Sequence, residues 1–156
     1  MKPTRALKPH GTYFVTFSIW QRRKLFVVEP YARLFLKILY GYRRQGRFEL
    51  HAFVVMPEHV HLLLTPAPDV TLERAIQFIK GGYSHELGVE GRKGEAWQRG
   101  FTDHRIRDSA DFDAHRDYIH DNPVKRGLVE AAADYRYCSA YPGFKLDSWP
   151  SAAKAA

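Results

Sequence analysis

Ten consecutive residues, Met56 to Thr65, constrain the fold of this chain more than any other stretch. Their sequence, MPEHVHLLLT, places two histidines directly before an apolar run. The run is typical of a β-strand, and side chains alternate across a strand, so His59 and His61 should share one face while Val60 and Leu62 occupy the other. Two imidazoles about 7 Å apart along one strand face can hold one divalent ion.

A histidine pair has a simpler alternative, because two histidines at the start of a strand are often only hydrogen-bonding groups. A second stretch, YIHDNP beginning at Tyr118, favours the metal-binding interpretation. Tyr118 and Asn122 are four residues apart near the end of an expected helix, so their side chains project from one face. If that face covers the histidine strand, His59, His61 and the Asn122 amide oxygen can hold Mg²⁺ or Mn²⁺, and Tyr118 can act as nucleophile. Spacing alone does not place the helix there.

The composition limits the classes of function. The chain of 156 residues carries 24 lysines and arginines against 17 acidic residues, a net charge of +7, and 14% aromatic residues. Basic residues interleaved with aromatic ones favour nucleic acid over a membrane surface as the partner. A single cysteine, Cys138, excludes an internal disulfide framework and fits a reducing compartment. No apolar run is long enough to span a bilayer, so we expect a cytoplasmic protein without a membrane partner.

Periodicity predicts one domain over residues 1–156, with a core from about 11 to 141, a basic N-terminal arm and a short C-terminal tail. Strands are predicted at 13–20, 48–55, 59–65 and 97–106, and helices at 30–45, from 72 onwards and from about 109 to 121. Two glycines, Gly81 and Gly82, should weaken the second helix, residues 88–94 should form a mobile loop, and Pro123 should end the third helix. The order predicts an α+β, ferredoxin-like fold, a mostly antiparallel sheet with packed helices.

Three motifs in this chain closely resemble those of the REP-associated tyrosine transposases. They are MPEHVHLLL from Met56, WQRGFTDHRIR from Trp97 and YIHDNPVKRGLV from Tyr118. These proteins are domesticated relatives of the insertion-sequence single-strand transposases, in the HUH (His-hydrophobic-His) endonuclease superfamily. The resemblance spans residues 13–141. It implies that the positions matching the metal ligands are His59, His61 and Asn122, and that Tyr118 matches the nucleophile.

The resemblance also implies a reaction and a partner. Tyr118 would attack a phosphodiester in single-stranded DNA, form a 5′-phosphotyrosine and release a 3′-hydroxyl. A second 3′-hydroxyl can then attack the phosphotyrosine, so strand joining needs no ATP. Relatives recognise palindromic hairpins and cut beside them, which implies single-stranded or hairpin DNA as the partner. Insertion-sequence relatives work as dimers, whereas the REP-associated relatives can act as monomers, so the resemblance allows both a homodimer and a monomer.

Several basic residues are candidates for contacts with the DNA backbone. They are Arg22, Arg23 and Lys24 after the first strand, Lys80 in the second helix, and Arg99, Arg105 and Arg107 around the fourth strand. Trp20, Trp97 and Phe101 could stack on bases, although core packing is the more ordinary role for Phe101. Two positions depart from the family pattern: Glu58 stands where aspartate is as frequent, and Cys138 where serine is frequent.

Two other functions compete with this hypothesis. A catalytically idle, sequence-specific DNA-hairpin-binding protein would keep the fold and the basic surface, but it would not need both histidines, the tyrosine and the asparagine. A small metal-dependent hydrolase acting on other substrates would use the histidine pair and leave the basic surface unexplained. We therefore predict a metal-dependent single-strand DNA transposase and endonuclease that nicks and rejoins DNA next to hairpin sequences.

Overall fold

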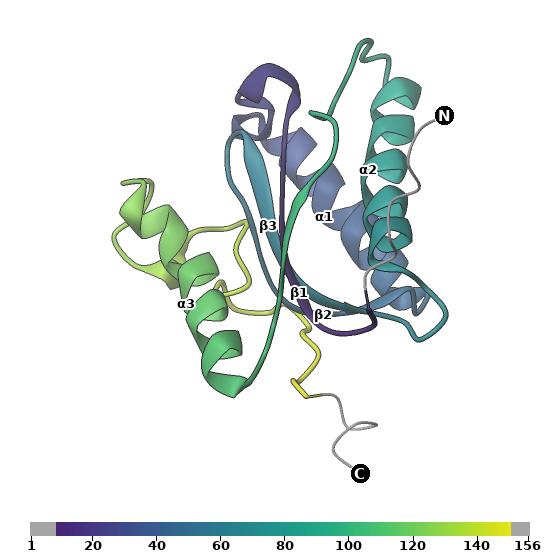
Figure 1. The fold of residues 1–156 in the computed structure, drawn as a ribbon. Helices are drawn as coiled ribbons and strands as arrows, with labels where there is room; N and C mark the ends of the chain where they lie inside the picture. The colour runs from purple at the N-terminus through teal and green to yellow at the C-terminus, as the bar shows by residue number, and fades with distance from the viewer. Residues whose placement is uncertain (1–8, 151–156) are drawn as a thin grey trace.

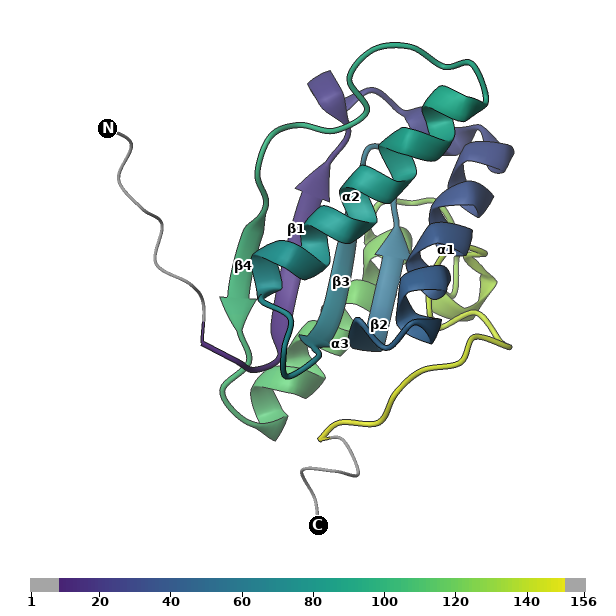
Figure 2. The same cartoon turned by 90° about the vertical axis from the view of Figure 1, so that its right-hand side faces the viewer.

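Four strands form one antiparallel sheet in the computed structural model, which describes residues 9–150. The strands are β1 (Tyr13–Ser18), β2 (Phe48–Val55), β3 (His59–Pro66) and β4 (Thr102–Arg105), in the spatial order β2-β3-β1-β4. Helices α1 (Glu29–Arg44) and α2 (Leu72–Val89) cover one face of the sheet, and α3 (Ser109–Lys125) covers the other (Figures 1 and 2). The predicted ferredoxin-like α+β arrangement is confirmed.

The sheet separates two apolar cores, and strand β3 contributes to both. Val60 and Leu62 enter the larger core, which also contains buried side chains of α1 and α2. Leu63 enters the smaller core, which contains Phe112 and Ile119 of α3. Since side chains alternate along a strand, His59 and His61 lie on the same face as Leu63 and therefore beneath α3.

The histidines are held at the start of β3 by a tight connection from β2. Val55 pairs with Val60 across the hairpin, and the Met56 amide donates to the His59 carbonyl over 2.8 Å. On the other side, β1 places Thr16 opposite His61 and Ser18 opposite His59. The pair therefore lies in a central strand, with paired backbone on both sides, which gives each imidazole a rigid base.

Helix α2 does not end at its glycines. It runs through Gly81 and Gly82 to Val89, so the predicted loop begins two residues later than expected. A Cβ at Gly82 would lie 2.7 Å from the Tyr42 hydroxyl of α1, so this glycine permits close approach of the two helices. Tertiary packing outweighs the intrinsic cost of about 1 kcal/mol per glycine.

The prediction that Pro123 ends the third helix is wrong. Helix α3 continues to Lys125, and Asn122 is helical. Proline removes only one backbone donor, and the helix ends instead in a Schellman motif: the Gly127 amide bonds the Val124 carbonyl, and the Leu128 amide bonds the Pro123 carbonyl over 2.9 Å. Gly127 has φ +72°, the left-handed conformation that this motif requires.

The predicted fourth strand is shorter than expected. Its ladder covers Thr102–Arg105, and Trp97 makes only an isolated bridge with Ile19. Gly100, with φ +76°, turns the backbone between these two segments. Within the described part of the chain, no helix has the length and apolar character needed to cross a membrane.

Replacing the glycine that ends α3 should destabilise the fold. Gly127→Ala forces a Cβ into the left-handed region, so we expect the free energy of unfolding to fall by about 1 kcal/mol. Gly81→Ala is the matched control, because Gly81 lies inside α2 and a Cβ added there would meet nothing within 4 Å. Alanine at that position should stabilise the protein by roughly 0.5–1 kcal/mol. Urea unfolding curves measure both. A neutral Gly127→Ala would contradict this account of the helix end.

Candidate active site

One stripe of α3 carries four polar side chains toward the sheet. Asp111, His115, Tyr118 and Asn122 follow the spacing i, i+4, i+7 and i+11, which keeps them on one side of a helix. The His115 ring contacts His104 of β4, and the Tyr118 ring lies 5.5 Å from that of His61, centroid to centroid. The helix therefore brings polar groups to two places on the same face of the sheet.

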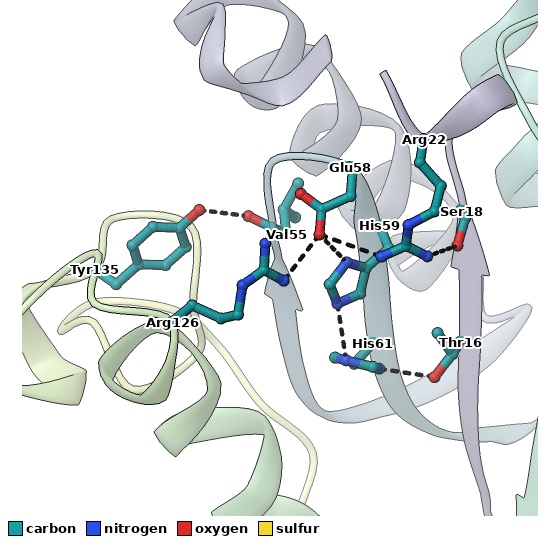
Figure 3. Close-up of polar contacts among 9 residues, drawn as sticks. All are labelled: Thr16, Ser18, Arg22, Val55, Glu58, His59, His61, Arg126 and Tyr135. Atoms are coloured by element: carbon teal, nitrogen blue, oxygen red, sulfur yellow. Dashed lines mark hydrogen bonds and ion pairs between the residues drawn. The ribbon is translucent and has the colours of Figure 1, made fainter. Parts of the chain in front are cut away.

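The two histidines of β3 point one nitrogen each at a common position. Their Nε2 atoms are 3.1 Å apart, and both side chains are buried. The outer nitrogens are already bonded: His59 Nδ1 lies 2.9 Å from Glu58 Oε1, and His61 Nδ1 lies 2.7 Å from Thr16 Oγ1 (Figure 3). Because a carboxylate only accepts, His59 carries its proton on Nδ1, so its Nε2 accepts the hydrogen bond between the two rings and the donor is His61 Nε2.

Both imidazoles are neutral at pH 7. Burial lowers the pKa of His59 below its ordinary value, although the Glu58 carboxylate opposes this shift. Burial is the main cause that lowers the pKa of His61 to about 3, and the like charge that His59 would carry if protonated lowers it further. Neutral imidazole is the form that ligates a metal ion. For His61 to ligate through Nε2, its proton has to move to Nδ1, where the Thr16 hydroxyl oxygen can accept the hydrogen bond.

Tyr118 and Asn122 lie on the same stripe of α3, and the Tyr118 ring is the one beside His61. The Tyr118 side chain is 43% exposed and can be reached by a large substrate. Asn122 is buried, and its Oδ1 has no hydrogen-bond partner among the described residues. A buried amide oxygen without a partner costs about 1–3 kcal/mol, so it indicates a position that a ligand satisfies. Two imidazole nitrogens and an amide oxygen are a donor set that fits a divalent cation.

A buried carboxylate, that of Glu58, connects the histidine strand to α3. Its Oε1 lies 2.9 Å from Nη1 of Arg126, at the end of α3, and 3.4 Å from Nη2 of Arg22 (Figure 3). Hydrogen bonds from Arg126 and His59 overcome the effect of burial and hold the pKa of Glu58 below its ordinary value. Glu58 was singled out in the sequence only as a departure from aspartate, and Arg126 was not singled out at all. Nothing local in the sequence joins these two positions.

Arg22 has an unusual backbone conformation beside this network. It ends a short 3-10 helix (Trp20–Arg22), and its φ is +51°, with Gln21 at +56°. Its Nη1 also donates to Ser18 Oγ over 3.2 Å. Left-handed conformations of non-glycine residues cost free energy and occur where surrounding contacts hold them, often at functional sites.

A second group of candidate ligands lies over β4. His104, Asp111 and His115 each offer one ligand atom, and these atoms lie within 4.8 Å of one another, which is consistent with a divalent metal. His104 Nε2 is 2.8 Å from Asp111 Oδ2, and His115 Nδ1 is 3.2 Å from Asp111 Oδ1. This group was not predicted from the sequence. The four-residue spacing of Asp111 and His115 was visible in the sequence, but their approach to His104 was not.

The seven basic residues proposed from the sequence lie in different surroundings. Lys24 and Arg99 are exposed, whereas Lys80 donates to the Gln98 and Gly100 carbonyls over 3.0 and 2.8 Å. The other side chains make these contacts: Arg22 with Glu58 and Ser18, Arg23 with the Glu95 carbonyl, Arg105 with the His10 carbonyl, and Arg107 with Asp111. Contacts within the protein therefore order most of these side chains.

A groove of about 470 Å³ begins beside the histidines. It is lined by Thr16, Ser18, Arg22, Gln98, Arg99, Phe101 and neighbouring residues, so two of the predicted DNA-binding arginines border one hollow. Trp97 does not face it. That side chain is buried against Phe17, Phe35 and Tyr83 in the larger core, so base stacking by Trp97 is excluded in this conformation.

Comparisons with known proteins agree with the motifs. Residues 9–122 match the family model described as transposase IS200 like. The chain is 34% identical over 128 residues to the REP-associated tyrosine transposase of Escherichia coli (strain K12), covering 81% of this chain and 74% of that protein. It is 32% identical over 151 residues to a putative REP-associated tyrosine transposase of Haemophilus influenzae, covering 90% and 85% respectively.

A solved structure shows the same fold. It is described as a REP associates tyrosine transposase bound to a REP hairpin, and it matches with a TM-score of 0.74 and 28% identity over 97% of this chain and 96% of that one. The resemblance inferred from the three motifs is confirmed. This chain belongs to the REP-associated tyrosine transposases, within the IS200-like transposase family.

Proposed function

We propose that this protein is a metal-dependent single-strand DNA transposase and endonuclease that nicks and rejoins DNA next to hairpin sequences. The observation that carries the proposal is the convergence of His59 Nε2 and His61 Nε2, 3.1 Å apart, beneath a helix whose Tyr118 ring is 5.5 Å from His61. The relative of known structure is bound to a REP hairpin, which supports hairpin DNA as the partner. The basic balance of the chain, +7, suits such a polyanion.

His59, His61 and Asn122 would hold the ion, for which we propose Mg²⁺ or Mn²⁺. Their neutral state and the unpartnered Asn122 oxygen support this assignment. A bound ion of this kind polarises a phosphoryl oxygen and orients the scissile phosphate. The chain's own contribution is to fix the imidazoles, through Glu58 on one side and Thr16 on the other, so that both Nε2 atoms face the same point.

Tyr118 would act as the nucleophile. Its phenol oxygen forms a bond to the phosphorus and loses its proton, while the bond from phosphorus to the 3′ oxygen breaks and that oxygen gains a proton. The products are a 5′-phosphotyrosine and a free 3′-hydroxyl. Attack by another 3′-hydroxyl reverses these changes and rejoins the strand without ATP. Phe14, whose ring is 5.8 Å from that of Tyr118, helps to hold the phenol in place.

The single strand would enter through the groove beside Thr16. Arg22 and Arg99 border this groove, and arginine binds phosphate oxygens with paired donors. Thr16 both lines the groove and bonds His61, so a strand lying there would present its backbone next to the ion-binding nitrogens. The reaction would take place in the cytoplasm, where a buried free thiol such as Cys138 is stable.

Removing the Tyr118 hydroxyl should abolish the covalent intermediate. With a hairpin-bearing single strand and Mn²⁺, Tyr118→Phe should form no protein–DNA adduct on a denaturing gel and should still bind the DNA. Tyr141→Phe is the control, because the Tyr141 ring packs against Phe144, which belongs to the larger core on the other face of the sheet. This variant should form the adduct as the wild type does. An adduct that persists in Tyr118→Phe removes Tyr118 from its role. Tight binding by the wild type without cleavage, under every divalent metal tried, identifies an idle hairpin-binding protein instead.

Neutralising Glu58 should lower the affinity of the site for Mn²⁺ and have a smaller effect on the cleavage rate at saturating Mn²⁺. Glu58→Gln removes the charge that orients His59 and holds Arg126, so we expect the Mn²⁺ concentration for half-maximal cleavage to rise roughly 10–100-fold. Excess Mn²⁺ should restore much of the rate. Glu29→Gln is the matched control. The Glu29 side chain is 47% exposed and makes only surface ion pairs, so this change should leave the Mn²⁺ dependence unaltered. An unaltered Mn²⁺ dependence in Glu58→Gln would rule out the positioning role.

Salt should reveal which arginines touch phosphate. For Arg99→Gln, the slope of log K against log salt concentration should decrease by about 1, because one phosphate contact and its released counterion are lost. Lys37→Gln is the control, since Lys37 is exposed on α1, which covers the face of the sheet opposite to the histidine pair. Fluorescence anisotropy at several salt concentrations measures both slopes. Equal slopes for Arg99→Gln and the wild type would show that Arg99 makes no phosphate contact.

A further inference from the structure

A second set of potential metal ligands joins the edge of the sheet to the start of α3. His104 is on β4, the edge strand, and Asp111 and His115 are in the first two turns of α3. We propose that these three residues form a second metal site, separate from the histidine pair of β3, for a transition-metal ion of the Zn²⁺ class. This inference does not rest on the proposed function.

The sheet order keeps the two groups apart. Strand β1 lies between β3 and β4, so the two histidine-bearing strands are roughly 10 Å apart at ~4.8 Å per strand. Phe14 of β1 is directly opposite His104, and its ring packs 5.3 Å from that of His61 and 4.9 Å from that of His115. Ions in two-metal catalytic centres are about 3.5–4 Å apart. An ion at His104 would therefore be an independent one, with an aromatic ring between it and the β3 histidines.

The donor set differs in character from the one on β3. Two imidazoles and a carboxylate are the ligands of many zinc sites with an open position, and imidazole favours the later transition metals over Mg²⁺. The Asp111 carboxylate is buried and ionised: burial raises its pKa, but hydrogen bonds from His104 and from the Arg107 amide lower it to about 2. It supplies a fixed negative charge next to His104 Nε2 and His115 Nδ1. His115 Nδ1 also donates to the Asp111 backbone carbonyl over 2.8 Å, so an ion would take the place of that hydrogen bond and of the proton that makes it.

The geometry leaves the group open to solvent on one side. The side chain of His104 is 40% exposed and that of His115 is 24% exposed, whereas Asp111 is only 6% exposed. The two rings stack 4.5 Å apart at 16°, so both present their edges to the same carboxylate. The Arg107 side chain also approaches Asp111, at 3.4 Å, but it is 76% exposed and free to turn into solvent when an ion binds.

An ion held here would act on the helix that carries Tyr118. Strand β4 has only four residues and pairs with one neighbour, so it has little to anchor it. His115 precedes Tyr118 by three residues, about one helical turn. Joining His104 to Asp111 and His115 would fasten the start of α3 to the sheet edge, in addition to the Glu58–Arg126 link at its other end.

Metal binding by protein lacking the β3 histidines tests this directly. The full chain, without a polyhistidine tag, would carry His59→Ala and His61→Ala and be titrated with Co²⁺ while its d–d absorption is followed, and with Zn²⁺ for stoichiometry. We expect one equivalent to bind and Zn²⁺ to raise the melting temperature. Adding either His104→Gln or His115→Gln should remove the bound equivalent and the thermal shift.

The control is His85→Gln in the same background, because His85 is exposed on α2, across the sheet. It should retain the equivalent. The melting curves show whether each variant is folded. Because His104→Gln and His115→Gln are made in separate proteins, the test can still be done if one of them does not fold. The proposal is overturned if the double-alanine protein binds no equivalent, or if the equivalent survives both His104→Gln and His115→Gln; the three residues would then be a hydrogen-bonded cluster only.

Discussion

One oxygen of a buried carboxylate holds the candidate site together. Glu58 Oε1 contacts His59 from the strand, Arg126 from the end of α3 and Arg22 from the loop after β1. A buried carboxylate is stable only when it is paired and hydrogen-bonded, so the folded chain must bring these three groups to it. The same contacts fix the end of α3 relative to the histidine strand, and with it the position of the Tyr118 ring beside His61.

Helix α3 relates the chemistry of the site to the architecture. Its polar stripe crosses the sheet, with Asp111 and His115 over β4 and Tyr118 beside His61 of β3. The apolar side chains Phe112 and Ile119 bury the helix in the smaller core. Because a helix is stiff along its length, anything that fastens one end constrains the other. A tyrosine on a packed helix, such as Tyr118, can then be exposed to solvent while its backbone stays fixed.

Local patterns predicted most of the elements and failed where contacts outweigh them. The second strand, Phe48–Val55, begins and ends where the sequence predicted it. Helix α2 passes through its glycines because Gly82 allows α1 to approach, and α3 passes Pro123 because a proline in the last turn costs one hydrogen bond that packing of the helix offsets. In both cases the residue has a low intrinsic helix propensity, and the free energy gained by packing the helix is larger than that cost.

The sequence by itself determined which side chains share a face, since alternation along a strand and the four-residue helical spacing are local properties: His59 with His61, and Tyr118 with Asn122. Only the tertiary structure decided that those two faces meet. It also decided that Glu58 bonds Arg126, 68 positions away, and that His104 lies against Asp111. Contacts between separate elements depend on the path of the whole chain and on the packing of two cores, and no short pattern encodes that path.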